Sequence, residues 1–287
     1  MSLNWTPLFS PHRLSRGVLS SKGKDGLSAS LTARKTLWFW WLTISILAPL
    51  LTCAAHSKEG LLGMDYHLKP SRDELKSFLH RYRSCSECRL HKNRKNLIMG
   101  KGSPEASVMI VLDRVSVDAA CSGNIMDGGE GKTLQQVLRF VAEDYPIVRN
   151  KWLWITSVVA CPTQRIGGKK VEMLPAPSIK EQAACYQRLC GEVNHIQPEI
   201  IIACGSAAAK TLKISGPHEG SLGRVVEGKI LGPNREYVVP VMVTYSMNQL
   251  YRNPTQNVRG MWNKTVGHIK QAVSISKILS EKRSEHS

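Results

Sequence analysis

The sequence predicts an α/β fold in which a mainly parallel central sheet is covered by helices on both faces. Short apolar runs rich in Val and Ile alternate with amphipathic segments from Met64 onward. Such runs are typical of strands buried on both faces, and strands that alternate with helices form parallel sheets. The hydrophobic content of 42% is sufficient for a packed core of this kind.

Each element has its own signal in the sequence. Strands are expected at "SVMIVLD" (107–113), "WLWITSVVA" (152–160), "PEIIIACG" (198–205) and "YVVPVMVTY" (237–245), because these runs are short and almost continuously apolar. The segment 71–83 begins with a Ser cap followed by acidic residues, and the segment 178–196 begins with a capping box of Ser178 and Glu181, so both are expected to be helices. Apolar residues at helical spacing predict further helices at 132–144, 206–212 and 260–279.

The carboxyl ends of the expected strands indicate where a functional site lies. In parallel sheets with helices on both faces, ligands bind in the crevice outside these ends. This rule selects Asp113, residues 157–161, Gly205 and residues 245–252. We therefore expect these segments to lie close together.

The segment "MDGGEGKTLQQVL", which begins at Met126, ends its glycine run with Gly-Lys-Thr and so looks like a phosphate-binding loop. That loop requires a glycine five positions before Gly131, and Met126 occupies this position. It must also follow a buried strand directly, whereas the nearest expected strand ends at Asp113. Both requirements fail, so the glycines do not indicate an NTPase.

The chain is strongly basic, with a formal net charge of +17 at pH 7 and a pI of about 9.7. This excess favours a polyanionic partner such as nucleic acid or an anionic membrane surface, and a merely soluble basic surface is the simpler alternative. Basic residues are densest in "HRYRSCSECRLHKNRKNLIMGKG", where they surround a cysteine pair. That placement favours a localised site over a diffuse charge.

Residues 1–63 differ from the rest of the chain. A basic, Ser-rich segment precedes the uncharged run "LWFWWLTISILAPLLTCAA" at 37–55, which is just long enough to span a membrane. The sequence leaves a membrane anchor, a targeting peptide and a start site set too far upstream as open interpretations. We therefore divide the chain into a leader at 1–63 and a domain at 64–287. We expect an intracellular monomer that is tethered to a membrane only if the 37–55 segment is an anchor.

Cys85 and Cys88 form a Cys-x-x-Cys pair, which alone is compatible with zinc, an iron-sulfur cluster or a redox pair. A redox pair opens a helix directly after a strand, whereas this pair follows a helix amid basic residues. Cys161 at a strand end and Cys185 in the next helix would complete a set of thiol ligands. The spacing alone does not separate zinc from iron-sulfur.

The order of these parts resembles the family 4 uracil-DNA glycosylases, the iron-sulfur branch of the uracil-DNA glycosylase superfamily. The shared parts are the Cys-x-x-Cys, a strand ending in a loop, a Gly-x-x-Gly, "ITSVVACP", a capped helix with "AAC", and "TYSMNQLYRNP", and they cover roughly residues 84–252. The resemblance implies a three-layer α/β/α sandwich, a DNA partner and a four-iron (4Fe-4S) cluster. Its ligands would be Cys85, Cys88, Cys161 and Cys185. The segment "IGGKKVEMLP" makes the interval between Cys161 and Cys185 longer than usual, so Cys190 is the reserve for the fourth ligand. Zinc is the alternative metal.

The resemblance also assigns roles near the expected crevice. Asp113 stands where the family has a carboxylate that helps to position water, and Ser246 stands where its His-Pro motif begins. The glycines at 123, 128 and 131 match a loop that closes over the extrahelical base. Met126 stands where the family has a stacking aromatic ring, and Ser157 stands where it has a base-reading asparagine. Leu250 and Tyr251 are expected to form a wedge beside the displaced base. The residues that we expect to contact base or DNA are Met126, Ser157, Asn248, Arg252, Arg94 and Lys95.

The departures from the family pattern weaken the expected chemistry. Cleavage of an N-glycosidic bond develops negative charge on the departing base, and one positioned donor is worth about 2.7 to 4 kcal/mol. A serine hydroxyl is neutral and shorter than imidazole, so we expect weak activity toward uracil. Ordinary structural roles also fit these residues: Asp113 as a helix cap, Met126 as core filler, and Ser157 and Ser246 as strand-end residues.

Two main functions therefore stay open. The chain is either an iron-sulfur DNA glycosylase that binds DNA and excises a damaged base with reduced or altered activity, or an inactive nucleic-acid-binding module of the same fold. A membrane-tethered protein whose basic face binds anionic lipid headgroups is a third hypothesis, and it requires the 37–55 segment to be an anchor.

Overall fold

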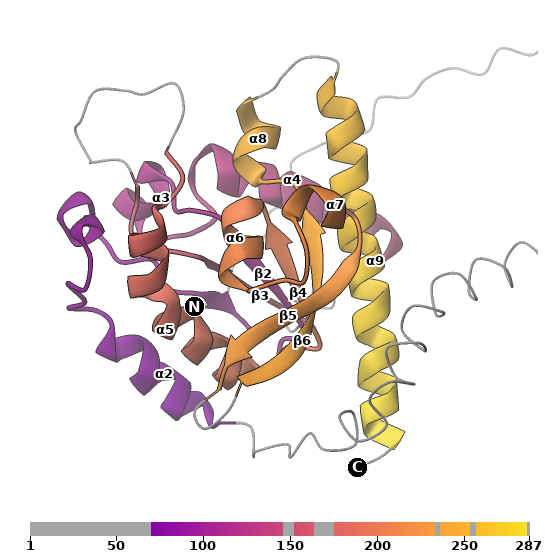
Figure 1. Cartoon of the computed structure of the whole chain (residues 1–287), viewed down its shortest axis with the longest axis horizontal. Coiled ribbons are helices and arrows are strands. Elements are labelled where there is room, and N and C mark those ends of the chain that lie inside the picture. Colours follow the sequence, from indigo (N-terminus) through magenta and orange to yellow (C-terminus); the bar gives the residue numbers. More distant parts are fainter. Residues whose placement is uncertain (1–69, 146–151, 164–174, 233–235, 253–256, 286–287) are drawn as a thin grey trace, which may run out of the picture. The chain divides into compact units, whose positions relative to one another are not determined.

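The computed structural model describes residues 70–145, 152–163, 175–232, 236–252 and 257–285 (Figure 1). These residues form a six-stranded sheet in the order β1-β3-β2-β4-β6-β5. The strands are β1 (Lys101–Gly102), β2 (Val108–Leu112), β3 (Leu153–Ser157), β4 (Ile200–Cys204), β5 (Val225–Leu231) and β6 (Glu236–Thr244). The inner strands β3, β2, β4 and β6 are parallel, and the edge strands β1 and β5 are antiparallel to their neighbours. The expected mainly parallel α/β fold is confirmed.

The helices begin where the sequence provides caps. Ser71 and Ser178 each form a capping box with the glutamate three residues later, as expected for α2 and α5. The helical segments are α2 (Arg72–Arg81), η1 (Arg89–Asn93), α3 (Val117–Ser122), α4 (Gly128–Asp144), α5 (Ile179–Ile196), α6 (Ser206–Thr211), α7 (His218–Ser221), α8 (Met247–Arg252) and α9 (Asn257–Glu285).

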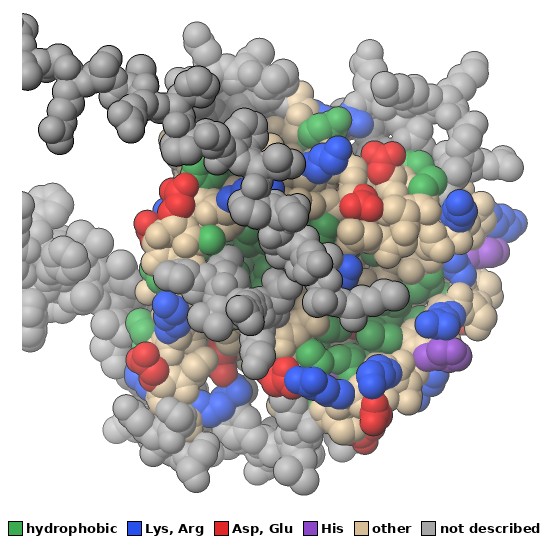
Figure 2. Space-filling view, turned by 180° about the vertical axis from the view of Figure 1, so that it is seen from behind, with side chains coloured by type: hydrophobic (Ala, Val, Ile, Leu, Met, Phe, Trp, Pro, Cys, Tyr) green, Lys and Arg blue, Asp and Glu red, His purple; other side chains and the backbone are tan. Residues whose placement is uncertain are grey.

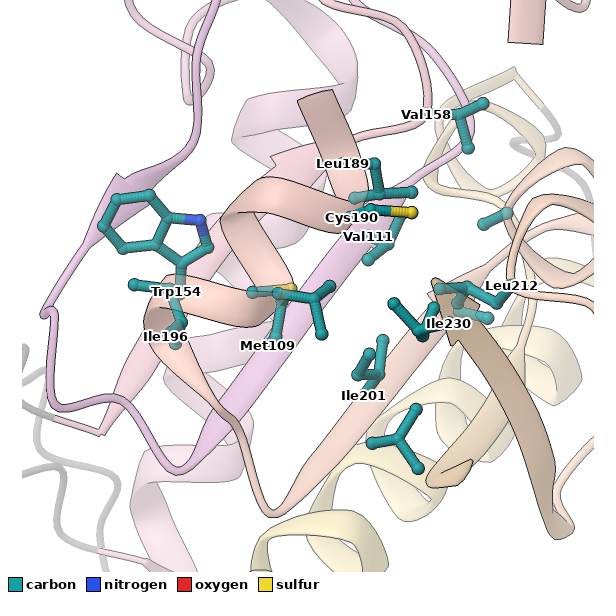
Figure 3. Close-up of a cluster of buried hydrophobic side chains, with 14 of the residues drawn as sticks. Met109, Val111, Trp154, Val158, Leu189, Cys190, Ile196, Ile201, Leu212 and Ile230 are labelled. Carbon is teal, nitrogen blue, oxygen red and sulfur yellow. The ribbon is translucent and has the colours of Figure 1, made fainter. Parts of the chain in front are cut away.

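Helices cover both faces of the sheet, so the core has two halves. Successive side chains of a strand point to opposite faces. In β2, Met109 and Val111 pack in the half that contains Leu189 of α5, and Figure 3 shows these side chains together. Ile110 lies in the other half with Leu134 of α4, and residues of α3 and α9 complete that half. This arrangement is the expected three-layer α/β/α sandwich.

Sequence patterns did not predict every element. The edge strand β5 has the sequence VVEGKIL, in which Glu227, Gly228 and Lys229 interrupt the apolar run, because only one face of this strand is buried. The two-residue strand β1 and the short helices α3, α7 and α8 also had no clear periodic signal. Helix α4 begins at Gly128, inside the glycine-rich segment, and therefore starts before the expected residue 132.

The leader stays outside the structural description. Among the described residues, no helix combines the length and the apolar character that crossing a membrane requires. The apolar segment at 37–55 and the boundary between residues 63 and 64 lie outside these residues. The division into a leader and a domain, the monomeric state and the membrane tether therefore stay predictions.

Candidate functional site

Asp113 and Ser246 meet at the carboxyl edge of the sheet. Asp113 directly follows β2, and Ser246 lies between β6 and α8. The Ser246 Oγ donates a hydrogen bond of 2.9 Å to Asp113 Oδ2, and Arg114 Nη2 lies 3.0 Å from the same oxygen. Asp113 is only 6% exposed and Ser246 only 4% exposed. The parallel sheet thus places the two expected catalytic residues in direct contact, as the strand-end rule predicts.

Gly205 makes this contact sterically feasible. It follows β4 with a φ of +97°, a conformation that L side chains rarely adopt. A Cβ at this position would lie 3.0 Å from the Ser246 Cβ and 3.1 Å from Asp113 Oδ2. Glycine therefore satisfies both the backbone conformation and the close approach of the two side chains.

The glycine-rich segment has a packing role. Gly128 opens α4 with a φ of +84°, and a Cβ on Gly131 would overlap the backbone of Met126. Met126 itself is half-buried and packs on the core half that contains α4. The glycines thus allow this loop to fold tightly against the start of α4.

The other expected base-contacting residues have different environments. Ser157 is fully buried, and its Oγ donates a hydrogen bond of 2.8 Å to the carbonyl of Val159, so its proton is already engaged. The backbone N–H of Asn248 donates to Ser246 Oγ at 3.2 Å, and its side chain is only 5% exposed. Leu250 lies in the core, so of the expected wedge only Tyr251 is exposed.

Glu130 is a buried carboxyl group that the sequence analysis missed. It lies in the first turn of α4 and is 6% exposed. Burial raises its pKa to about 7; the nearby Asp113 charge raises this pKa further, while Arg114 and Arg252 oppose the increase. An acid in the first turn of a helix ordinarily stabilises the helix dipole, so the sequence alone gave no reason to single it out.

The cysteines expected to bind a metal converge on one cavity. Cys85 and Cys88 lie between α2 and η1, Cys161 follows β3, and Cys185 lies on α5; all of them line the cavity. Cys190 is not among its lining residues and is instead buried in the core.

Two arginines donate to sulfur atoms in this cavity. Arg94 Nη1 lies 3.3 Å from Cys161 Sγ, and Arg188 Nε lies 3.4 Å from Cys185 Sγ. Burial raises the pKa of Cys88 and of Cys161, and the neighbouring Cys185 thiol adds to both increases. For Cys161, the hydrogen bond and charge of Arg94 oppose the increase. The cavity therefore favours thiolates only where positive charge is brought near them.

Arg188 connects the cysteine cavity to the end of β3. It is 1% exposed and donates to Thr156 Oγ1 at 3.0 Å and to the carbonyl oxygens of Ser157 and Val158. Its charge is paired at 2.7 Å with Glu192, which is also fully buried. This network was not predicted from the sequence.

The basic residues around the cysteines are mostly exposed. Figure 2 shows Lys, Arg and His side chains gathered along the edge of the molecule that α2 and η1 form. The exposed basic residues of this region are Arg81, Arg83, Arg89, Lys92, Lys95 and Lys101. Arg94 differs, because it is half-buried and also donates to the Cys85 carbonyl at 2.7 Å. Lys95 is therefore better placed than Arg94 to meet an external partner.

Comparison with known proteins agrees with this geometry. The family model described as "Uracil DNA glycosylase superfamily" matches residues 99–270. The chain belongs to the uracil-DNA glycosylase superfamily. A type-4 uracil-DNA glycosylase of Pyrobaculum aerophilum is 30% identical over 189 residues, which cover 63% of this chain and 86% of that protein. A type-4 uracil-DNA glycosylase of Thermotoga maritima is 27% identical, with 66% of this chain and 90% of that protein covered. Within the superfamily, the chain therefore groups with the type-4 branch.

Proposed function

We propose that this member of the uracil-DNA glycosylase superfamily is an iron-sulfur DNA glycosylase, which hydrolyses the N-glycosidic bond of a damaged base flipped out of DNA. The observation that carries the proposal is the Asp113–Ser246 contact at the carboxyl ends of β2 and β6. It lies at the carboxyl edge of the sheet, which is the edge where α/β folds of this kind bind ligands. The relatives bear the name uracil-DNA glycosylase, which makes uracil the first substrate to test.

Asp113 suits the electrostatics of this reaction. The bond breaks with positive charge developing on the sugar, and a buried carboxylate close to that charge stabilises it. The same carboxylate can orient the water that adds to the sugar carbon. Ser246 and Arg114 hold Oδ2 in place through hydrogen bonds of 2.9 and 3.0 Å.

An inactive DNA-binding module is the second candidate, and the hydroxyl groups favour it. The Ser246 proton is directed to Asp113, and the Ser157 proton is directed to the Val159 carbonyl. Neither hydroxyl is therefore available to donate to a departing base without rearrangement. If no other donor replaces them, excision will be slow.

The cysteine cavity fits a four-iron cluster, which when bound supplies a rigid cross-link between its ligands and couples metal binding to folding. Cys85, Cys88, Cys161 and Cys185 would hold it, and Arg94 and Arg188 would donate to the sulfur atoms. Within the described ranges, no three His, Cys, Asp or Glu side chains lie close enough together to ligate a single metal ion. Zinc, which binds thiolates in tetrahedral geometry, is the alternative metal.

DNA is the partner that we infer from the exposed basic residues. Lys92 and Lys95 lie on the surface beside the cysteine cavity, and Arg252, which is half-buried, is the last residue of α8. Contacts between such residues and phosphates release counterions and give salt-dependent affinity.

Excision assays test the proposal. Oligonucleotides with a single uracil or hypoxanthine, in single- and double-stranded form, would be incubated with the protein, and abasic sites would be detected by strand cleavage. Asp113→Asn should lower the excision rate at least about 100-fold, a loss comparable to removing one preorganised electrostatic group, while DNA affinity is retained. Equal rates for both proteins would reject the role of Asp113. DNA binding by the unaltered protein without excision of any base would favour the second candidate.

The cluster has a separate test. Protein purified without air should be brown, with broad visible absorbance, and should contain iron and sulfide in equal amounts. Cys161→Ser should bleach it and lower thermal stability. Colourless protein with one stoichiometric zinc would reject the cluster.

A further inference from the structure

Helices α4 and α8 carry buried polar atoms without hydrogen-bond partners. These helices pack against each other (Figure 1). Gly129 of α4 lies so close to the ring of Tyr251 in α8 that a Cβ at Gly129 would overlap it. Within the part of the chain that the structure describes, the buried atoms that lack a hydrogen-bond partner include Glu130 Oε1, Asn248 Oδ1 and Arg252 Nε. Buried polar groups in proteins are nearly always hydrogen-bonded, so such atoms indicate a missing partner.

The Asp113–Ser246 contact lies beside these atoms. The Asn248 backbone donates to Ser246 Oγ, and the charges that act on Glu130 are those of Asp113, Arg114 and Arg252. Glu130 is 94% buried, and the charge of Asp113, the proposed catalytic carboxylate, raises its pKa. Burial is the main cause of the raised pKa of Glu130, about 7, so this carboxyl group holds a proton in much of the protein at neutral pH.

We propose that Glu130 is a base-binding residue, donating a hydrogen bond from its carboxyl group to a carbonyl oxygen of a flipped lactam base such as uracil or hypoxanthine. This inference rests on the proposed function of the site. The protonated group offers one donor and one acceptor, which match the adjacent C=O and ring N–H of a lactam. The Ser246 and Ser157 hydroxyls, whose protons are engaged elsewhere, do not supply this donor.

The charge state of Glu130 decides whether this contact helps. A neutral carboxyl group donates to the base oxygen and continues to stabilise it as negative charge develops there. An ionised carboxylate cannot donate and repels the same oxygen. The raised pKa, about 7, keeps much of the group neutral at neutral pH, with burial as its main cause.

Binding to uncleavable DNA tests the proposal. One duplex would carry 2′-fluoro-2′-deoxyuridine, whose N-glycosidic bond resists hydrolysis, and a matched duplex would carry a tetrahydrofuran abasic site, which has no base. The ratio of the two dissociation constants isolates the contribution of the base. Glu130→Ala should reduce this contribution about tenfold, in line with the loss of one good base contact, and should leave affinity for the abasic duplex unchanged.

The pH dependence separates hydrogen bonding from packing. For the unaltered protein, the contribution of the base should decrease between about pH 6 and about pH 8 as Glu130 ionises. Glu130→Gln retains a neutral donor and acceptor, so its contribution should be the same at both pH values. Glu143→Gln, an exposed position of the same helix, is the control and should behave like the unaltered protein.

Each outcome decides between the proposals. Unchanged base affinity in Glu130→Ala, or equal weakening of both duplexes, overturns the role of Glu130 even if uracil is excised. Selective weakening in a protein that excises nothing supports Glu130 as a base-binding residue and overturns the glycosylase assignment. If the unaltered protein shows no base-dependent affinity at either pH, the role of Glu130 fails, and the excision assay alone decides the glycosylase assignment.

Discussion

Glu130 should make the stability of this protein depend on pH even without DNA. Its pKa in the folded protein is about 7, against an ordinary value of 4.5. The folded state therefore holds a proton that the unfolded state releases between these pH values. The associated stabilisation is fully present below about pH 4.5 and is lost as the pH rises to about 7.

The magnitude follows from the difference between these pKa values. Subtracting 4.5 from about 7 gives about 2.5 pH units, and at about 1.36 kcal/mol per unit this corresponds to about 3 kcal/mol. Glu130→Gln is neutral at every pH and does not suffer this loss. At about pH 8 it should be more stable than the unaltered protein by up to about 3 kcal/mol, and the difference should disappear only as the pH falls below about 4.5.

Thermal or urea unfolding measured across this pH range checks the prediction. About 3 kcal/mol corresponds to an increase in Tm on the order of 5 to 10 °C for a domain of this size. Glu143→Gln, which is exposed on the same helix, should show a difference that does not vary with pH. A difference for Glu130→Gln that is constant from about pH 5 to about pH 8 would refute the reasoning, because it would mean that Glu130 does not change its ionisation on folding.

Three further perturbations test other parts of the structure. Gly205→Ala should destabilise the fold by about 2 kcal/mol or more, measured by urea unfolding, because it combines a φ of +97° with a close approach to the Asp113 site. Joint replacement of Lys92 and Lys95 by Glu should lower the slope of log affinity for DNA against log salt concentration by about 2, or about 0.9 per lost phosphate contact. An unchanged slope would show that DNA does not contact this surface. Arg188→Met should cost about 3 to 5 kcal/mol because it leaves Glu192 buried without its partner. Adding Glu192→Leu should recover part of that loss, and a further loss of similar size would contradict the pairing.

The sheet was predictable because its inner strands are buried on both faces. Strands such as β2 and β4 must be apolar at every position, so they appear as continuous runs in the sequence. The Asp113–Ser246 contact was predictable for a related reason, since parallel strands bring their carboxyl ends to one edge. The edge strand β5 exposes one face and so carries Glu227 and Lys229, which conceal its strand character.

The directions of long polar side chains were not predictable. Arg188 and Glu192 have the spacing of an ion pair on an exposed helix face, and this pattern ordinarily indicates solvent. Both are instead fully buried, because Arg188 finds carbonyl acceptors at the end of β3 and Glu192 accepts from Trp154 Nε1 at 3.1 Å. Arg94 likewise belongs to a basic run but donates to Cys161. Only the tertiary structure supplies these partners.

Arg188 also gives a physical reason for the two sites to be connected. One guanidinium group donates to Cys185 Sγ in the cysteine cavity and to the carbonyl oxygens of Ser157 and Val158, which lead into the strand-end site. A fully buried guanidinium group with this many partners cannot shift toward one set without leaving atoms of the other set unsatisfied. The position of Cys185 and the backbone after β3 are therefore coupled. A change that displaces the thiol should also displace the segment that carries Ser157, which pairs with Leu112 at the carboxyl end of β2.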